Sequence, residues 1–103
     1  MKSLNINDVK YEVIENVNDA IDIELLKDKI TDYFNEFDYI VGDYAYNKLR
    51  LKGFNDKNNK HFKSINDINN LHKYIDEYCA YGCKWFCIKK ITNKDWFRLF
   101  VLL

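Results

Sequence analysis

The side chains best suited to chemistry in this 103-residue chain are the basic and aromatic ones of one segment, residues 43–63. It holds Arg50, one of only two arginines in the chain. A guanidinium can hold a carboxylate or a phosphate through two parallel hydrogen bonds, and aromatic rings between positive charges can stack on bases. These properties select as candidate binding residues Asp43, Tyr44, Tyr46, Lys48, Arg50, Lys52, Lys57, Lys60 and Lys63.

Alternating residues at 39–44 and 48–54 predict a β-hairpin, with Asn47 as the turn residue best able to adopt a left-handed conformation. A connection with an odd number of residues would bury the Asp43 carboxylate among leucines, which is costly without a partner. We therefore predict an even connection that makes Asp43 and Arg50 cross-strand neighbours. The pair is either a surface ion pair worth about 0–1 kcal/mol, or a carboxylate that orients Arg50 toward a ligand oxygen.

Three cysteines, Cys79, Cys83 and Cys87, follow a C-x3-C-x3-C spacing. A zinc site would need a fourth ligand, which only the two histidines could supply, and the spacing does not fit the iron–sulfur cluster of radical enzymes. Reduced cysteine packs as a small apolar residue, and disulfides are rare in a reducing cytosol. We therefore expect three reduced cysteines, no metal and no cofactor.

The best catalytic set available combines Asp76, Glu77 and Tyr78 with either Cys83 or His72. Acidic residues one position apart on a helix do not share a face, which weakens a paired-carboxylate mechanism. The sequence also lacks a glycine-rich phosphate loop and the H-E-x-x-H motif. An enzyme is therefore less favoured than a binding protein.

Charge is balanced overall but uneven along the chain. Residues 15–38 carry eight acidic residues against two lysines, and residues 48–63 carry six basic residues against one aspartate. Such segregation predicts a dipolar molecule with one basic face. No apolar segment is long enough to span a bilayer, and the N-terminal residues lack the apolar stretch of a signal peptide, so a cytoplasmic location is expected.

Further elements are predicted on both sides of the hairpin. Extended pieces at 4–6 and 9–15 should meet in a turn at Asn7-Asp8, and apolar spacing predicts a helix over 20–35 with Asp19 as N-cap. Polar residues 55–66 indicate a mobile loop.

The C-terminal part of the chain begins with a second amphipathic helix, predicted over 67–81 and closed by Gly82 in a left-handed turn. Its apolar stripe is predicted to consist of Ile68, Leu71, Ile75, Tyr78 and Cys79. Residues 83–91 are typical of a strand, and residues 95–103 form a last apolar strand candidate. The order from residue 9 to 91 is therefore β-α-β-β-α-β, that of a ferredoxin-like or related two-layer sandwich. We predict a single α+β domain over 1–103, with a mostly antiparallel sheet, two helices packed on one face and short terminal strands.

Four short motifs carry a family resemblance: YIVGDY at 39–44, LRLKGF at 49–54, YIDEYC at 74–79, and Gly82-Cys83 followed by Trp85-Phe86. Together they resemble the YutD-like family, small uncharacterised cytoplasmic proteins of low-GC Gram-positive bacteria and mollicutes. The resemblance covers about residues 9 to 91. Tyr44 stands where the family pattern suggests Trp. The resemblance implies a fold but supplies no activity, substrate or catalytic residues.

The expected function is therefore a non-enzymatic binding or regulatory role, in which the free sheet face and the lysine loop contact RNA or a ribonucleoprotein. Two alternatives remain open for a protein partner. One is an acidic protein surface bound by the same residues, and the other is strand addition through residues 95–103. The sequence does not decide the oligomeric state.

Overall fold

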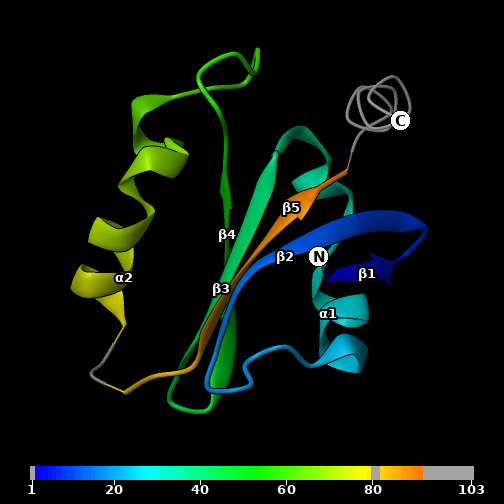
Figure 1. Ribbon diagram of the computed structural model, residues 1–103, viewed down its shortest axis with the longest axis vertical. Coiled ribbons are helices and arrows are strands. Elements are labelled where there is room, and N and C mark those ends of the chain that lie inside the picture. Colours follow the sequence, from blue (N-terminus) through cyan, green and yellow to red (C-terminus); the bar gives the residue numbers. More distant parts are fainter. Residues whose placement is uncertain (1, 80–81, 92–103) are drawn as a thin grey trace.

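An antiparallel sheet organises the part of the chain that the computed structural model describes, residues 2–79 and 82–91 (Figure 1). Five strands form this sheet in the order β1-β2-β5-β3-β4, and every neighbouring pair is antiparallel. The strands are β1 Ser3–Ile6, β2 Val9–Val17, β3 Tyr39–Ala45, β4 Lys48–Phe54 and β5 Trp85–Lys90. The α+β class and the antiparallel sheet are thus as predicted.

Two tight turns set the register of the hairpins. The β1–β2 turn has Asn7 and Asp8 at φ 52° and 67°, and the β3–β4 turn has Tyr46 and Asn47 at φ 53° and 64°. Two-residue connections with both residues at positive φ match the right-handed twist of the flanking strands. The predicted turn at Asn7-Asp8, the even connection and the left-handed Asn47 are therefore confirmed. Tyr46 is the unexpected member, because a bulky residue at positive φ is strained.

The position of β5 separates this sheet from a ferredoxin-like one. Here β5 lies between β2 and β3, a place that the second strand of the central hairpin takes in the ferredoxin-like order. Burial explains the choice, because Phe86, Cys87 and Ile88 are successive residues and all are buried. Such a strand needs cover on both faces and belongs at the centre of a sheet, whereas the alternating charges of β4 suit an edge.

The helices are shorter than predicted. Helix α1 spans Ile23–Lys29 and a 3₁₀ turn follows at Asp32–Glu36. The N-cap is Asp22, whose carboxylate accepts from the Leu25 N–H at 3.2 Å, and not Asp19. Asn16 explains the delayed start, because its side-chain oxygen accepts the N–H groups of residues 20 and 21 and holds them in a turn.

Helix α2 spans Leu71–Tyr78 and follows two 3₁₀ turns, Ser64–Asn66 and Ile68–Asn70. Gly82 adopts the predicted left-handed conformation, with φ 74°, but the helix already ends at Cys79. None of the helices in the described ranges is long and apolar enough to cross a membrane. The strand candidate at 95–103 lies outside the described residues.

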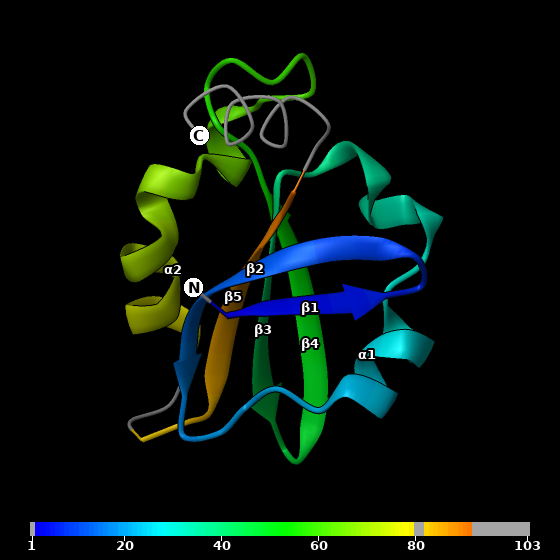
Figure 2. The same cartoon turned by 45° about the vertical axis from the view of Figure 1, so that its right-hand side comes forward.

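Each face of the sheet carries its own hydrophobic cluster and its own helix (Figures 1 and 2). Leu26 of α1 packs with Ile40 and Phe86 on one face. On the other face, Leu71 of α2 packs in a cluster that includes Val41 and Cys87. Successive strand residues point to opposite faces, so each helix forms a two-layer pack with a different side of the sheet. The predicted placement of both helices on one face is corrected accordingly, and no whole face is left free within the described part.

Close packing between strands explains Gly42, because a Cβ atom at this position would overlap the ring of Phe86. Replacing Gly42 with alanine should therefore lower the free energy of unfolding by about 1–3 kcal/mol. Urea unfolding followed by tryptophan fluorescence measures this change. Ser3→Ala, at an exposed position of β1, is the control and should stay within about 0.5 kcal/mol of the parent. An unchanged stability for Gly42→Ala would contradict the contact between β3 and β5.

Candidate functional site

Asp43 and Arg50 face each other across the β3–β4 hairpin, as predicted. The Arg50 Nε donates to Asp43 Oδ1 at 3.1 Å, and Nη2 donates to Oδ2. The hydrogen bond with Asp43 is the main cause that raises the pKa of Arg50. Asp43 is only 1% exposed and the Arg50 side chain is 42% exposed. The pair is therefore a buried carboxylate neutralised by a half-exposed guanidinium, and not a plain surface ion pair.

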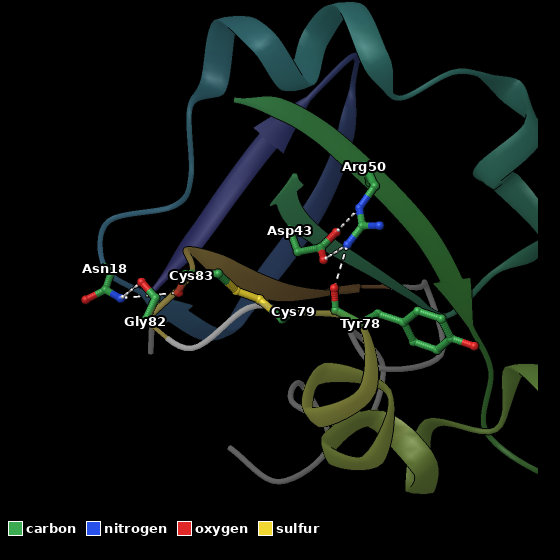
Figure 3. Close-up of a disulfide and its surroundings, with 7 residues drawn as sticks. All are labelled: Asn18, Asp43, Arg50, Tyr78, Cys79, Gly82 and Cys83. Carbon is green, nitrogen blue, oxygen red and sulfur yellow. Dashed lines mark hydrogen bonds and ion pairs between the residues drawn. A yellow bond between two sulfur atoms is a disulfide. The ribbon is translucent and has the colours of Figure 1, made fainter. Parts of the chain in front are cut away.

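The same guanidinium also binds helix α2. Arg50 Nη2 donates to the backbone carbonyl of Tyr78 at 2.9 Å, at the last residue of the helix (Figure 3). A cation is favourable there, because the carbonyls at a helix C-terminus carry a partial negative charge. Arg50 thus connects β3, β4 and α2 through contacts within the chain.

Tyr44 and Tyr46 lie away from this pair. Tyr44 is on the α1 face, where its hydroxyl donates to the Ala20 carbonyl at 2.9 Å and burial is the main cause that raises its pKa. The Lys84 ammonium stands 5.1 Å from the centre of its ring. Tyr46, at the tip of the hairpin, is 99% exposed, and the neighbouring Lys48 is exposed as well.

Lys57, Lys60 and Lys63 belong to the segment that follows the opposite end of β4. This segment is the green loop at the top of Figure 1. The seven residues of β4 span about 20 Å at the usual rise per residue, so this loop is far from the hairpin tip. The segment predicted to be mobile is held by hydrogen bonds. Asp38 accepts from the Asp56 N–H at 2.9 Å and from the Asn59 side chain at 3.0 Å.

The nine predicted residues therefore do not form one surface. They divide into a hairpin tip, an ion pair beneath the end of α2, a distant loop, and Lys52. The Lys52 ammonium lies 5.2 Å from the ring centre of Phe54 and 5.6 Å from that of Tyr74. These two rings pack edge to face, 5.6 Å apart, between β4 and α2. Of the nine residues, Lys60 lines one hollow of the described surface, beside Glu36 and His61, and Lys52 leads to another concave part.

That concave part is a groove of about 360 Å³ between β4 and α2. Its apolar lining includes Ile65, 76% exposed, and Tyr78, 58% exposed, which are among the most exposed large apolar side chains described. Tyr74 packs against both Tyr78 and Phe54, and burial is the main cause that raises its pKa. The charged side chains that line it are Lys52, Lys73 and Glu77.

Most residues that line this groove were not among the candidate binding residues predicted from the sequence. Tyr78 was assigned to the buried stripe of the second helix, but it faces solvent at the rim of the groove. The available signals were the spacing of four residues between Tyr74 and Tyr78, which places both rings on one helix face, and the isolated apolar Ile65 in a polar segment.

The cysteines also differ from the prediction. Cys79 and Cys83 form a disulfide, with their Cα atoms 6.0 Å apart, so the expectation of three reduced cysteines is corrected. Cys83 precedes β5 and does not share a strand face with Cys87. Cys87 is a buried free thiol, and burial is the main cause that raises its pKa to about 12. In the disulfide form Cys83 is not available as the nucleophile of the catalytic set considered above.

Removing the guanidinium tests the role assigned to the ion pair. Arg50→Ala should lower the free energy of unfolding by about 2–4 kcal/mol, because it leaves the Asp43 carboxylate buried without its cation. Adding Asp43→Asn should recover part of the loss, since the amide carries no charge. Chemical denaturation measures the free energy of unfolding of the parent, of Arg50→Ala and of the double variant.

The matched control is Lys27→Ala, which breaks an exposed pair with Glu24 at 3.3 Å and should cost no more than about 0.5 kcal/mol. If Arg50→Ala and Lys27→Ala have equal effects, the Asp43 carboxylate does not depend on Arg50.

Comparisons with known proteins agree with the fold. A family model described as "Putative antitoxin YutD-like" matches residues 5–89. The chain is 41% identical over 88 residues to "Putative antitoxin YutD" of Bacillus subtilis (strain 168). The aligned residues make up 85% of this chain and 97% of the relative. It is also similar to the solution NMR structure of protein yutD from B. subtilis. That alignment has a TM-score of 0.71 and 38% sequence identity over 88% of this chain and 83% of that chain.

Proposed function

Because this chain belongs to the YutD-like family, we propose that it acts as a non-enzymatic antitoxin in the cytoplasm, by binding a partner protein in the groove between β4 and α2. The observation that carries this proposal is the pairing of exposed apolar side chains, Ile65 and Tyr78, with charged residues in one groove. Interfaces are commonly built from such aromatic anchors inside a polar rim. The antitoxin role itself comes from the name of the B. subtilis relative.

The charges of the groove indicate what kind of segment it binds. Lys52 and Lys73 stand against Glu77 in the lining, so the groove is weakly positive. An acidic side chain of the partner would pair with a lysine, while a neighbouring apolar side chain would cover Ile65 and Tyr78. We therefore favour an acidic and apolar protein segment.

RNA was the first expectation from the sequence, and the arrangement of charges favours it less than a protein. A groove for single-stranded nucleic acid needs positive charge that follows the backbone beside its stacking rings. Arg50 is engaged with Asp43 and Tyr78, and the loop lysines lie at the far end of β4. The groove itself contains Glu77. RNA or a ribonucleoprotein therefore becomes an alternative outcome of the test.

Site-specific crosslinking tests the groove directly. A photoreactive phenylalanine derivative at position 65 should capture, from nuclease-treated lysate of the source cells, a protein whose crosslinked segment is acidic and apolar. The same group at Tyr33, which is 65% exposed and packs with Phe34 and Phe37 in the α1-face cluster, should not capture it. Capture that depends on intact RNA, or equal capture from both positions, would contradict the proposal.

The captured partner then allows a quantitative test. Tyr78→Ala should weaken its binding by about tenfold or more, as expected for an aromatic anchor, whereas Tyr33→Ala should leave binding unchanged. Isothermal titration calorimetry measures both. Expression of the partner alone should arrest growth, and co-expression with the parent chain, but less so with Tyr78→Ala, should restore it. A partner without effect on growth would refute the antitoxin role while leaving the binding site intact.

A further inference from the structure

The disulfide between Cys79 and Cys83 joins the end of α2 to the segment that leads into β5 (Figure 3). Their Cα separation of 6.0 Å lies in the ordinary range for disulfides, so the two sulfur atoms can meet without a large backbone movement. Both cysteines are only half-buried, and they line a surface pocket of about 390 Å³ together with Ile75, Asp76 and Trp85. An attacking thiolate can therefore approach the bond from solvent.

The third cysteine does not share this accessibility. Cys87 is fully buried at the centre of the sheet, and burial raises its pKa to about 12. Thiol–disulfide exchange requires a thiolate with access to the disulfide. Cys87 therefore cannot compete with Cys79 and Cys83 near neutral pH, and the pair can break and re-form without mispairing.

Hydrogen bonds anchor the chain on both sides of the disulfide. On the helix side, the Cys79 N–H donates to the Ile75 carbonyl at 2.9 Å, and the carbonyl of Tyr78 accepts from Arg50. On the other side, the Asn18 side chain donates to the carbonyls of Gly82 and Cys83 at 3.3 and 3.2 Å. The covalent bond thus ties the last turn of α2 to a segment that β2 and the following turn already hold in place.

The span of the disulfide points to a local role. Only four positions separate the two cysteines, and a cross-link over so short a distance restricts the unfolded chain much less than one that closes a long loop. Its main effect is therefore on α2, an eight-residue helix that is too short to be stable without packing.

We propose that Cys79 and Cys83 form a reversible thiol–disulfide exchange site that controls the C-terminal turn of helix α2. In the oxidised form the disulfide holds this turn against the sheet. In the reduced form the covalent tie to the sheet is lost, the hydrogen bond from Arg50 and the packing of α2 are what hold this turn against the sheet, and the last turn opens. Because Tyr74, Glu77 and Tyr78 line the groove, the redox state also reshapes one wall of that groove.

The exchange is balanced with a dithiol as reductant. One thiolate of the dithiol attacks a sulfur atom of the pair, which breaks the Cys79–Cys83 bond, forms a mixed disulfide and releases the other cysteine as a thiolate. The second thiolate of the reductant then attacks the reductant's own sulfur in the mixed disulfide, which breaks that bond and releases the remaining cysteine as a thiolate. The reductant leaves with an intramolecular disulfide. Two electrons pass to the protein, and the two cysteine sulfurs take up two protons. A low-molecular-weight disulfide re-forms the Cys79–Cys83 bond through two exchange steps of the same kind.

Hydrogen exchange on the full chain tests this proposal without any partner, so its outcome does not depend on the proposed function. Amides at the end of α2, residues 75–79, should exchange about tenfold faster in dithiothreitol than in oxidised glutathione. Amides of Phe86 to Ile88, which lie in a central strand, should exchange equally slowly in both. Alkylation and mass spectrometry, in denaturant, should count one free thiol in the oxidised protein and three in the reduced one.

Two variants separate the pair from the buried thiol. Cys83→Ser should exchange like the reduced parent in both buffers, whereas Cys87→Ala should keep the full response to oxidation. The proposal is overturned if α2 exchanges at one rate in both redox states of the parent chain, or if the reduced pair fails to re-form in oxidised glutathione. The parent protein alone decides both points, so a variant that fails to fold does not prevent the test.

Discussion

A buried carboxylate must be neutralised where it lies, and Asp43 imposes this requirement in β3, next to the edge strand β4. It lies on the β3 face that α2 covers, and Arg50 is the residue directly opposite on β4. The same guanidinium reaches the last carbonyl of α2. One cation thereby fixes the position of two strands and of a helix that has too few residues to be stable in isolation. The groove and the disulfide both depend on where that helix ends.

Much of the hairpin could be predicted from the sequence, because a period of two leaves few choices. Burying Asp43 among leucines is costly, and this fixed the number of turn residues and made Asp43 and Arg50 partners. The order of the strands could not be predicted in the same way, since periodicity shows which side chains are buried but not which strand lies beside them. The consecutive apolar residues Phe86, Cys87 and Ile88 did carry a usable signal. A strand buried on both faces needs a cover on each, and this places the two helices on opposite sides.

The candidate site was harder to predict, because neighbours in sequence need not share a surface. Asp43 and Tyr44 are adjacent, yet the pleat of β3 sends them to opposite faces. The lysines of the following loop are close in sequence to Lys52 but lie beyond the end of the strand. The groove instead combines β4 with α2, and the helix lies about twenty residues further along the chain. Contacts of this kind follow from the sheet order, which the sequence did not determine.

The distribution of charge constrains how any partner can be recognised. The sequence predicted a dipolar molecule, but the structure brings part of the basic segment back to the acidic one. Lys60 and His61 lie beside Glu36 and Asp38, and His61 Nδ1 is 3.7 Å from a Glu36 carboxylate oxygen. The positive charge of Lys60 and the negative charges of Glu36 and Asp38 therefore lie close together and weaken each other's field at long range. A partner would therefore gain little from electrostatic steering, and association rates near the unsteered range of about 10⁵–10⁶ M⁻¹s⁻¹ are expected. Affinity would then depend on how slowly the complex dissociates, and so on the apolar and aromatic contacts that helix α2 holds in place.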